Sequence, residues 1–330
     1  MPIIEVKNLR KVYNANVVAL KGISFEVEEG EIFGFLGPNG AGKTTTVHIL
    51  CTLTAPTSGS AKVCGFDVVE RPDDVRRKIG FVPQDISVDD DLTARENLEL
   101  HAKLYHIPKA VREKRIEELL ELVGLQERAD SLVKTFSGGM RRRLEIAEGL
   151  LHNPEVLFLD EPTIGLDPAS RILIWEQLRE LNKEGVTIFL TTHYMDEADR
   201  LCNRIAIIDA GEIRVVGKPN ELKEGVGGDI LIIRTDDTAR FSERLLSLPF
   251  VSNVSSQNGT LRITVKNGEK TIPLIFEEAQ KLGVSIESIF LSRPTLDDVF
   301  IKYTGRSLGS EKTDWIERYK QHMLMKRRRR

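Results

Sequence analysis

The sequence predicts an α/β domain followed by a smaller α+β domain, and three observations support this. First, an apolar run at 32–36 enters a glycine-rich loop that opens a helix. Second, the apolar runs at 156–159 and 186–190 are continuous, as in parallel strands buried on both faces. Third, glycines at 225–228 precede a new alternation of strands and helices. With 330 residues, 41% of them hydrophobic, the chain is long enough to bury a core in each of two domains.

The glycine-rich loop is the most informative motif. Residues 37–44 have the sequence Gly-Pro-Asn-Gly-Ala-Gly-Lys-Thr, the form that cradles phosphates with inward-pointing backbone N–H groups. Lys43 is suited to reach the β and γ oxygens and Thr44 to offer a hydroxyl to Mg²⁺, and the helix expected over 45–50 points its N-terminal dipole at the same phosphates. A glycine-rich surface turn is the alternative, which the flanking strand and helix disfavour. The predicted nucleotide-binding residues are Gly37, Pro38, Asn39, Gly40, Ala41, Gly42, Lys43, Thr44 and Thr45.

A pair of acids follows the strand expected at 156–159. Asp160 at this strand end can hold Mg²⁺ through water, as the second acidic element of P-loop NTPases does. Glu161 can orient and deprotonate the attacking water. A solvated strand cap is the alternative, which the phosphate loop disfavours. We therefore predict a P-loop NTPase fold that binds a nucleotide, with Lys43 and Glu161 as catalytic residues and Thr44 and Asp160 on the metal.

Four further features narrow the function. Gln84 follows an expected strand and can coordinate metal or water, and the ring of Tyr13 can stack on adenine. His193 lies at the C-terminal end of the strand that begins at 186, where ligand sites gather in α/β sheets. Ser137-Gly138-Gly139 opens a helix and suits an anion. A second phosphate site without a second loop suggests that it serves a partner's ATP, and the alternative is a plain helix N-cap.

The pattern of apolar residues places these motifs in two domains. Helical periodicity over 93–151 predicts a helical insert of about 90–152, and the first domain is expected to end near Leu222. The strands expected in it are Ile3–Leu9, Gly22–Val27, Ile32–Leu36, Ala61–Cys64, Ile79–Val82, Val156–Leu159, Val186–Leu190 and a hairpin of Ile205–Ile208 with Ile213–Val216.

Residues 226–305 are expected to form a separate regulatory or dimerising domain. Their predicted elements are strand Ile230–Arg234, helix Ala239–Leu248, strand Val251–Ser256, a turn at Asn258-Gly259, strand Thr260–Val265, helix Ile272–Leu282 and strand Ser285–Leu291. This βαββαβ order predicts a ferredoxin-like domain.

Charge and composition exclude several classes of protein. The net charge of −3 gives no global basic field for nucleic acid, and no apolar run approaches the roughly 20 residues that span a bilayer. The N-terminus lacks the features of a signal peptide, so we expect a soluble chain that is not exported. Cys51, Cys64 and Cys202 are expected to be ordinary core thiols. Residues 306–330 carry nine Lys/Arg against three acids, which predicts either a solvated terminus or attraction to anionic lipid.

The motifs together resemble a known family. Tyr13, GPNGAGKTT, Gln84, SGGM, LFLDEP, GLD at 165–167 and His193 are similar in order and separation to the ATP-binding subunit of an ABC transporter, over residues 1 to about 222. The segments Phe136–Leu144, Arg293–Phe300 and Tyr303–Arg306 are similar to the daunorubicin-resistance type of drug-exporter ATPase. One departure is that Phe136 and Met140 stand where the signature commonly has Leu and Gln.

The resemblance implies a role for each matching residue. Tyr13 would stack on adenine, Gln84 would sense the metal and contact the membrane subunit, and His193 would contact the γ-phosphate. The signature at 137–139 would contact the ATP that is bound to the other subunit of a dimer. Asp167 would shape the interface between the two subunits.

A mechanism and a location follow from the resemblance. A homodimer would close around two ATP and drive export of a drug or lipophilic compound through a separately encoded permease, at the cytoplasmic face of the membrane. Two rivals remain: a non-transport ABC ATPase acting on ribosomes or DNA, and a regulatory nucleotide switch without turnover.

Overall fold

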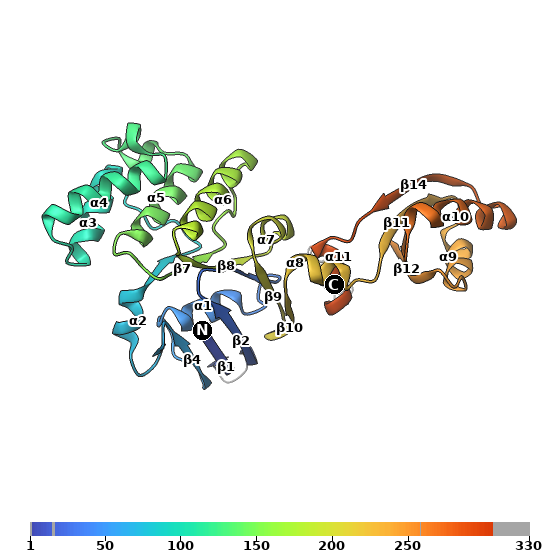
Figure 1. Cartoon of the computed structure of the whole chain (residues 1–330), viewed down its shortest axis with the longest axis horizontal. Helices are drawn as coiled ribbons and strands as arrows, with labels where there is room; N and C mark the ends of the chain where they lie inside the picture. Colours follow the sequence, from blue (N-terminus) through green and yellow to red (C-terminus); the bar gives the residue numbers. More distant parts are fainter. Residues whose placement is uncertain (1, 15–16, 258, 306–330) are drawn as a thin grey trace, which may run out of the picture. The chain divides into compact units, whose positions relative to one another are not determined.

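The computed structural model describes residues 2–14, 17–257 and 259–305 (Figure 1). The chain divides into two compact units, one ending at Lys218 and one beginning at Pro219. The boundary comes slightly before the expected Leu222, because helix α8 (Pro219–Glu224) packs against α11 (Leu296–Thr304) of the second unit. The expected basic tail, 306–330, lies outside the described residues.

The centre of the first unit is a six-stranded sheet of order β10-β9-β3-β8-β7-β6. Its strands are β3 (Ile32–Leu36), β6 (Ile79–Val82), β7 (Val156–Asp160), β8 (Thr187–Thr192), β9 (Arg204–Asp209) and β10 (Glu212–Gly217). All neighbours pair in parallel except β10, which returns antiparallel to β9. Strands β3, β7 and β8 are buried along their whole length, as their continuous apolar runs predicted.

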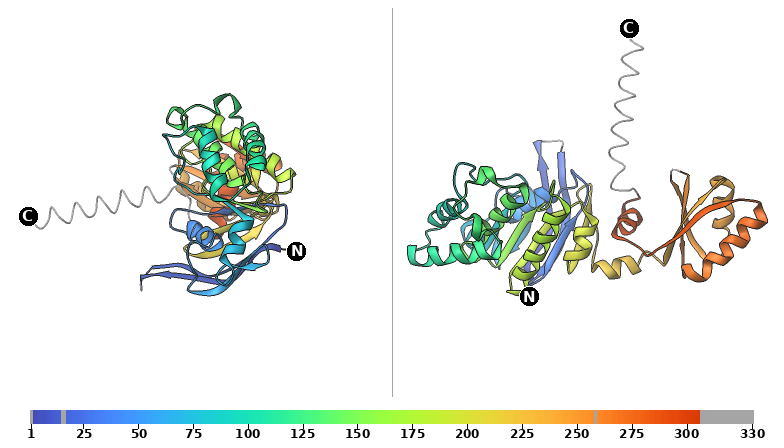
Figure 2. Two further views of the ribbon diagram at one scale, coloured as in Figure 1. Left: turned by 90° about the vertical axis from the view of Figure 1, so that its left-hand side faces the viewer. Right: turned by 90° about the horizontal axis from the view of Figure 1, so that it is seen from above.

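A second, antiparallel sheet of order β2-β1-β4-β5 packs on the first. It consists of β1 (Pro2–Tyr13), β2 (Val17–Glu28), β4 (Ser58–Val63) and β5 (Phe66–Asp67). The rings of Phe25, Phe33, Phe35 and Phe189 join the sheets, with centroids 5.3 to 6.0 Å apart. Strands β1 and β2 are longer than predicted: β1 continues to Tyr13 and β2 begins at Val17, and both of these ends are largely exposed (Figure 2).

Helices surround the six-stranded sheet, and those within residues 90–152 form the predicted helical insert. The bounds are α1 (Lys43–Leu50), α2 (Pro72–Lys78), α3 (Ala94–Leu104), α4 (Lys109–Leu122), α5 (Gly138–Leu150), α6 (Pro168–Lys183) and α7 (Met195–Leu201), with short 3₁₀ turns η2 (Gln126–Arg128) and η3 (Val133–Thr135). Helices α3, α4 and α5 gather at the end of this unit opposite β1, β2 and β4 (Figure 1). Cys51 and Cys202 are buried free thiols, and Cys64 is half-buried.

The second unit has the predicted ferredoxin-like order. Its further elements are β11 (Asp229–Thr235), α9 (Thr238–Leu246), β12 (Val251–Gln257), β13 (Thr260–Val265), α10 (Gly268–Leu282) and β14 (Ile286–Ser292). The antiparallel sheet has the order β12-β13-β11-β14, and α9 and α10 cover one face (Figure 2). Helix α10 begins before the expected Ile272 because Asn267 caps it, accepting from the backbone N–H of Lys270. Asn258 of the predicted turn lies outside the described residues.

Candidate active site

The loop between β3 and α1 lies close against neighbouring strands. Gly40 and Gly42 have φ of +76° and +110°, a backbone region that favours glycine. A Cβ on Gly37 would lie 2.3 Å from the carbonyl oxygen of Ile208, and one on Gly42 would lie 2.8 Å from that of Ala19. The backbone of the loop therefore requires glycine at these positions.

Lys43 is buried inside the loop. Its Nζ donates to the carbonyl oxygens of Gly37 (2.8 Å) and Pro38 (3.1 Å), and it lies 3.1 Å from Oε1 of Glu161. The ammonium therefore already has a carboxylate partner. A phosphate entering the loop would compete with Glu161 for this cation.

The two acids at the end of β7, Asp160 and Glu161, are held by the neighbouring strand β8. Thr191 Oγ1 donates to Asp160 Oδ1 and accepts from the backbone N–H of Glu161 at 3.0 Å. Glu161 has a φ of +50°, which is strained for a residue with a side chain. A second bond, from its N–H to the carbonyl oxygen of Thr191 (3.2 Å), helps to hold this conformation. Asp160 is buried, with 1% of its surface exposed.

His193 completes this cluster. Its Nδ1 lies 3.0 Å from Oε2 of Glu161. Burial raises the pKa of the Glu161 carboxyl, but the bond to His193 and the ammonium of Lys43 outweigh burial, so the net pKa lies below its usual value. Glu161 is therefore ionised at neutral pH and fixed in direction by two partners, as a general base requires.

Lys43 and Glu161 border a cavity of about 420 Å³, whereas Asp160 and His193 are not among the residues that line it. Its lining includes loop and α1 residues together with Tyr13 from the end of β1, Gln84 from the loop after β6, and Glu161. The structure thus brings side chains far apart in sequence to one cavity. Oxygen donors and the buried cation Lys43 suit a phosphate and a hard metal ion.

The Ser137–Gly139 segment does not line this cavity. Ser137 caps α5 and accepts from the N–H of Met140 (3.3 Å). Asp167 caps α6 and accepts from the N–H and hydroxyl of Ser170, at 3.0 and 2.6 Å. A Cβ on Gly139 would lie 2.6 Å from Ser170 Oγ, so the two helix starts pack together. The predicted residues therefore form two separate groups within one chain.

Comparisons with known proteins decide the family. The family model described as "ABC transporter" matches residues 20–164, and one described as "ATP-binding protein DrrA1-3-like, C-terminal domain" matches 217–304. The "Linearmycin resistance ATP-binding protein LnrL" of Bacillus subtilis is 40% identical over 92% of this chain and 99% of its own. The chain is an ABC transporter ATP-binding subunit. The comparisons thereby confirm the ABC ATPase assignment, the presence of a small C-terminal domain and the resemblance to the drug-exporter type.

Three other comparisons describe the relatives. A "Nod factor export ATP-binding protein I" of Cupriavidus metallidurans is 41% identical over 93% of this chain and 98% of its own. A solved structure described as a dimeric, post-hydrolysis state of the ATP-binding cassette MJ0796 bound to ADP and Pi is 32% identical, with a TM-score of 0.59 over 65% of this chain and 98% of that one. DrrA itself is described as a daunorubicin/doxorubicin resistance ATP-binding protein of Streptomyces peucetius. ATP binding and hydrolysis are therefore properties of the family to which this ABC ATPase belongs.

Sequence reasoning missed the residues that position the Gln84 loop of this ABC ATPase. Arg142 on α5 donates from Nη1 to the carbonyl oxygen of Pro83 (2.5 Å) and from Nη2 to that of Gln84 (2.6 Å). Glu145, one turn on, lies 3.0 Å from Arg142 and accepts from the N–H of Ser87 (2.6 Å). The sequence signal that could have revealed them is the pair of charged residues on the face of α5 that is otherwise apolar and buried.

Within residues 2–14, 17–257 and 259–305, no group of three His, Cys, Asp or Glu could hold a metal ion. No helix in that part of the chain is long and apolar enough to cross a membrane.

Proposed function

We propose that this ABC ATPase binds two ATP between two copies of itself and couples their hydrolysis to export through a membrane permease. The observation that carries the proposal is the separation of the two groups of residues: the cavity holds Lys43 and Glu161, while the signature serine, Ser137, is exposed elsewhere. A half-site of this kind is completed by a second copy. The MJ0796 cassette is described as dimeric, which supports the same arrangement.

Within each site the roles follow from position. The loop N–H groups and Lys43 would bind the phosphates, with Tyr13 stacking on adenine. When Lys43 exchanges Glu161 for phosphate, the carboxylate is released toward water. Glu161 would take a proton from the water that attacks the γ-phosphorus, and the bond to the β–γ bridging oxygen breaks to leave ADP and phosphate. His193 would hold Glu161 in direction and contact the γ-phosphate.

Thr44, Gln84 and Asp160 supply the oxygen atoms that Mg²⁺ prefers. Mg²⁺ bound there would neutralise charge on the phosphates and orient them. The few protein ligands suit Mg²⁺, which usually keeps waters and phosphate oxygens in its shell. From the partner copy, Ser137, Gly138 and Gly139 would contact the γ-phosphate at a helix N-terminus, with Asp167 at the seam.

The names of the relatives favour transport over the two rivals, because they refer to resistance and export. We therefore assign lipophilic compounds as the class of exported substrate, and the cytoplasmic face of the membrane as the location of the protein. The ferredoxin-like unit, residues 226–305, is assigned regulation or dimerisation.

Substitution of Glu161 by Gln tests the proposal. The variant should lose hydrolysis by about 10²- to 10⁴-fold, since the base is gone. It should bind ATP at least as tightly as the parent chain, because Lys43 loses a competing partner. With ATP and Mg²⁺ it should elute as a dimer in size-exclusion chromatography, and Lys43→Met should stay monomeric. A Glu161→Gln chain that binds ATP but remains a monomer would contradict the proposal.

A further inference from the structure

A lysine side chain lies against the aromatic ring at the edge of the nucleotide cavity. Lys11 and Tyr13 are two residues apart on β1. The Nζ atom of Lys11 lies over the ring of Tyr13, 4.9 Å from the ring centroid, which is within the range of a cation–π interaction. Tyr13 lines the nucleotide cavity, whereas Lys11 is not among the residues that line it. The cation therefore contacts the ring from outside the cavity.

Two oxygen atoms hold the Lys11 ammonium in this position. Nζ donates to the hydroxyl oxygen of Thr54 at 3.0 Å and to the carbonyl oxygen of Ala55 at 2.6 Å. Both acceptors are uncharged, and no carboxylate of the described residues forms an ion pair with this nitrogen. An ammonium has three N–H donors, so one of them remains for the ring. Because its partners are neutral, the cation keeps its full charge where it faces Tyr13.

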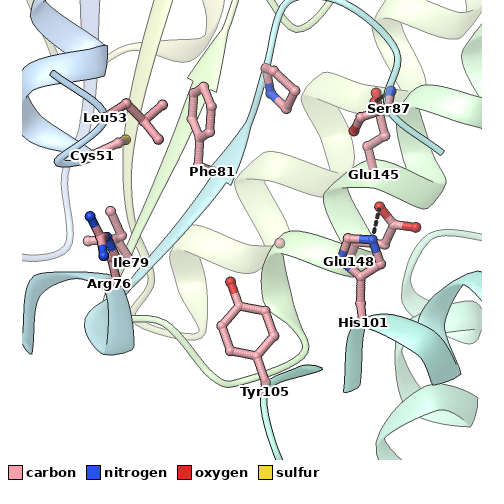
Figure 3. Close-up of a pocket in the computed structure, with 12 residues that line it drawn as sticks. Cys51, Leu53, Arg76, Ile79, Phe81, Ser87, His101, Tyr105, Glu145 and Glu148 are labelled. Carbon is pink, nitrogen blue, oxygen red and sulfur yellow. Dashed lines mark hydrogen bonds and ion pairs between the residues drawn. The ribbon is translucent and has the colours of Figure 1, made fainter. Parts of the chain in front are cut away.

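The segment that anchors this lysine follows the helix that begins in the phosphate loop. Leu53 lies just beyond the end of α1, immediately before the two anchoring residues (Figure 3). Thr57, a little further along, binds β1 on either side of the lysine: its N–H donates to the carbonyl oxygen of Arg10 (2.8 Å), and its hydroxyl accepts from the N–H of Val12 (2.9 Å). The end of β1 that carries the ring is thereby fixed to the helix whose first residue is Lys43.

The cation changes what the other side of the ring can bind. The face of an aromatic ring carries partial negative charge, so two rings stacked face to face repel each other unless they are offset. A positive charge on one face draws π electrons toward itself and lowers the negative charge on the opposite face. Adenine, whose own face is electron-rich, would then stack more favourably on that face. The same contact fixes the orientation of a ring that is 37% exposed.

We propose that Lys11 is a positioning residue for the purine base: it orients and polarises the Tyr13 ring, and so raises the affinity for ATP without touching the nucleotide. This rests on the proposed function, in which Tyr13 stacks on adenine. The gain in affinity should be that of a cation–π interaction at a partly exposed site, about three- to tenfold. Because it acts on binding of the base and not on the reacting phosphate, it should alter KM for ATP and leave kcat unchanged.

Lys11→Met tests this inference, because it keeps an unbranched side chain and removes the charge. In titration calorimetry with Mg²⁺, the affinity of the full chain for ATP should fall about three- to tenfold. Inorganic tripolyphosphate, which has the phosphates and no base, should compete equally well for the parent and the variant. Lys11→Arg keeps a cation that can lie on the ring and should retain most of the affinity. Lys7→Met, on the same strand at an exposed lysine paired with Glu5, is the matched control and should change neither result.

A double-variant cycle shows whether the lysine acts through the ring. In a Tyr13→Leu chain the base has no ring on which to stack, so adding Lys11→Met should cause no further loss of affinity for ATP. Thermal unfolding without nucleotide checks that each variant is folded. If Lys11→Met does not fold, Thr54→Val provides the test, because it removes one anchor of the ammonium and keeps the charge. It should lower the affinity for ATP about twofold in the parent chain and not in the Tyr13→Leu chain.

The outcomes separate this inference from the proposed function. If the parent chain binds no ATP, or Tyr13→Leu binds ATP as tightly as the parent, the proposed function fails at this site. If Tyr13→Leu weakens ATP binding and Lys11→Met does not, the inference about the lysine alone is overturned. Equal losses of affinity for ATP and tripolyphosphate in Lys11→Met would also overturn it, because the lysine would then attract the phosphates. So would a loss that persists in the Tyr13→Leu chain.

Discussion

Removing the Arg142 side chain should destabilise the first unit strongly. Arg142 and Glu145 are each 3% exposed, and the guanidinium is bonded to two carbonyl oxygens as well as to the carboxylate. Arg142→Met leaves the buried acid without its cation, and breaking a buried pair in this way costs about 3–5 kcal/mol. Substituting both members, Arg142→Met with Glu145→Leu, removes the unpaired charge and should cost less than Arg142→Met alone.

The assay is urea unfolding followed by the fluorescence of Trp175, which is buried in the first unit. Trp315, which lies outside the described residues, is replaced by Phe so that the signal has one source. Glu180→Gln serves as the surface control. A loss below about 1 kcal/mol for Arg142→Met, or a double variant as unstable as the sum of the two single ones, would refute this account of the clamp on the Gln84 loop.

Two further predictions concern the signature helix α5, at Gly139 and at the buried acid Glu148. Gly139→Ala places a Cβ 2.6 Å from Ser170 Oγ, so it should lower the free energy of unfolding by about 1–3 kcal/mol and weaken ATP-dependent dimer formation, as measured by urea unfolding and by size-exclusion chromatography. In Gly138→Ala the nearest contact of the new Cβ is an ordinary 3.4 Å, so this control should lose less stability. Equal losses of stability in the two variants would contradict the close packing of Gly139 on Ser170. Burial raises the pKa of Glu148 to about 8 against 4.5 in the unfolded chain, which means that the folded state binds the extra proton, so stability should fall between about pH 5 and 8 by up to about 1.4 kcal/mol per unit. Glu148→Gln should flatten that slope in urea titrations, and an unchanged slope would count against a raised pKa at Glu148.

The core sheet and the phosphate loop could be predicted because their determinants are local. A continuous apolar run predicted β3, and the glycines that follow it are required by close approaches to Ile208 and Ala19. The pairing of Lys43 with Glu161 could not be predicted in the same way. The sequence placed Lys43 in the loop after one strand and Glu161 just after another, but the distance between them depends on the order of strands in the sheet.

Other features depend on contacts between distant segments. The hydrogen bonds from Arg142 join α5 to the loop after β6, and although buried charged residues on α5 are a signal, neither segment alone identifies the other as the partner. Helix α11 was not predicted, although a capping box of Thr295 with Asp298 marks its start. The predicted bounds of β1 and β2 stopped short of their ends, where Tyr13, Val17 and Val18 are apolar but exposed, so sequence pattern and burial do not coincide there.

The central claim is that one chain contributes only half of the residues of each nucleotide site. Serial dilution of the purified protein tests this claim most directly. Hydrolysis of ATP per chain is measured with Mg²⁺ as the protein is diluted through the range in which light scattering shows dimers giving way to monomers. The account predicts that activity per chain falls toward zero along with the dimer fraction. Activity per chain that stays constant while the protein is entirely monomeric would contradict it.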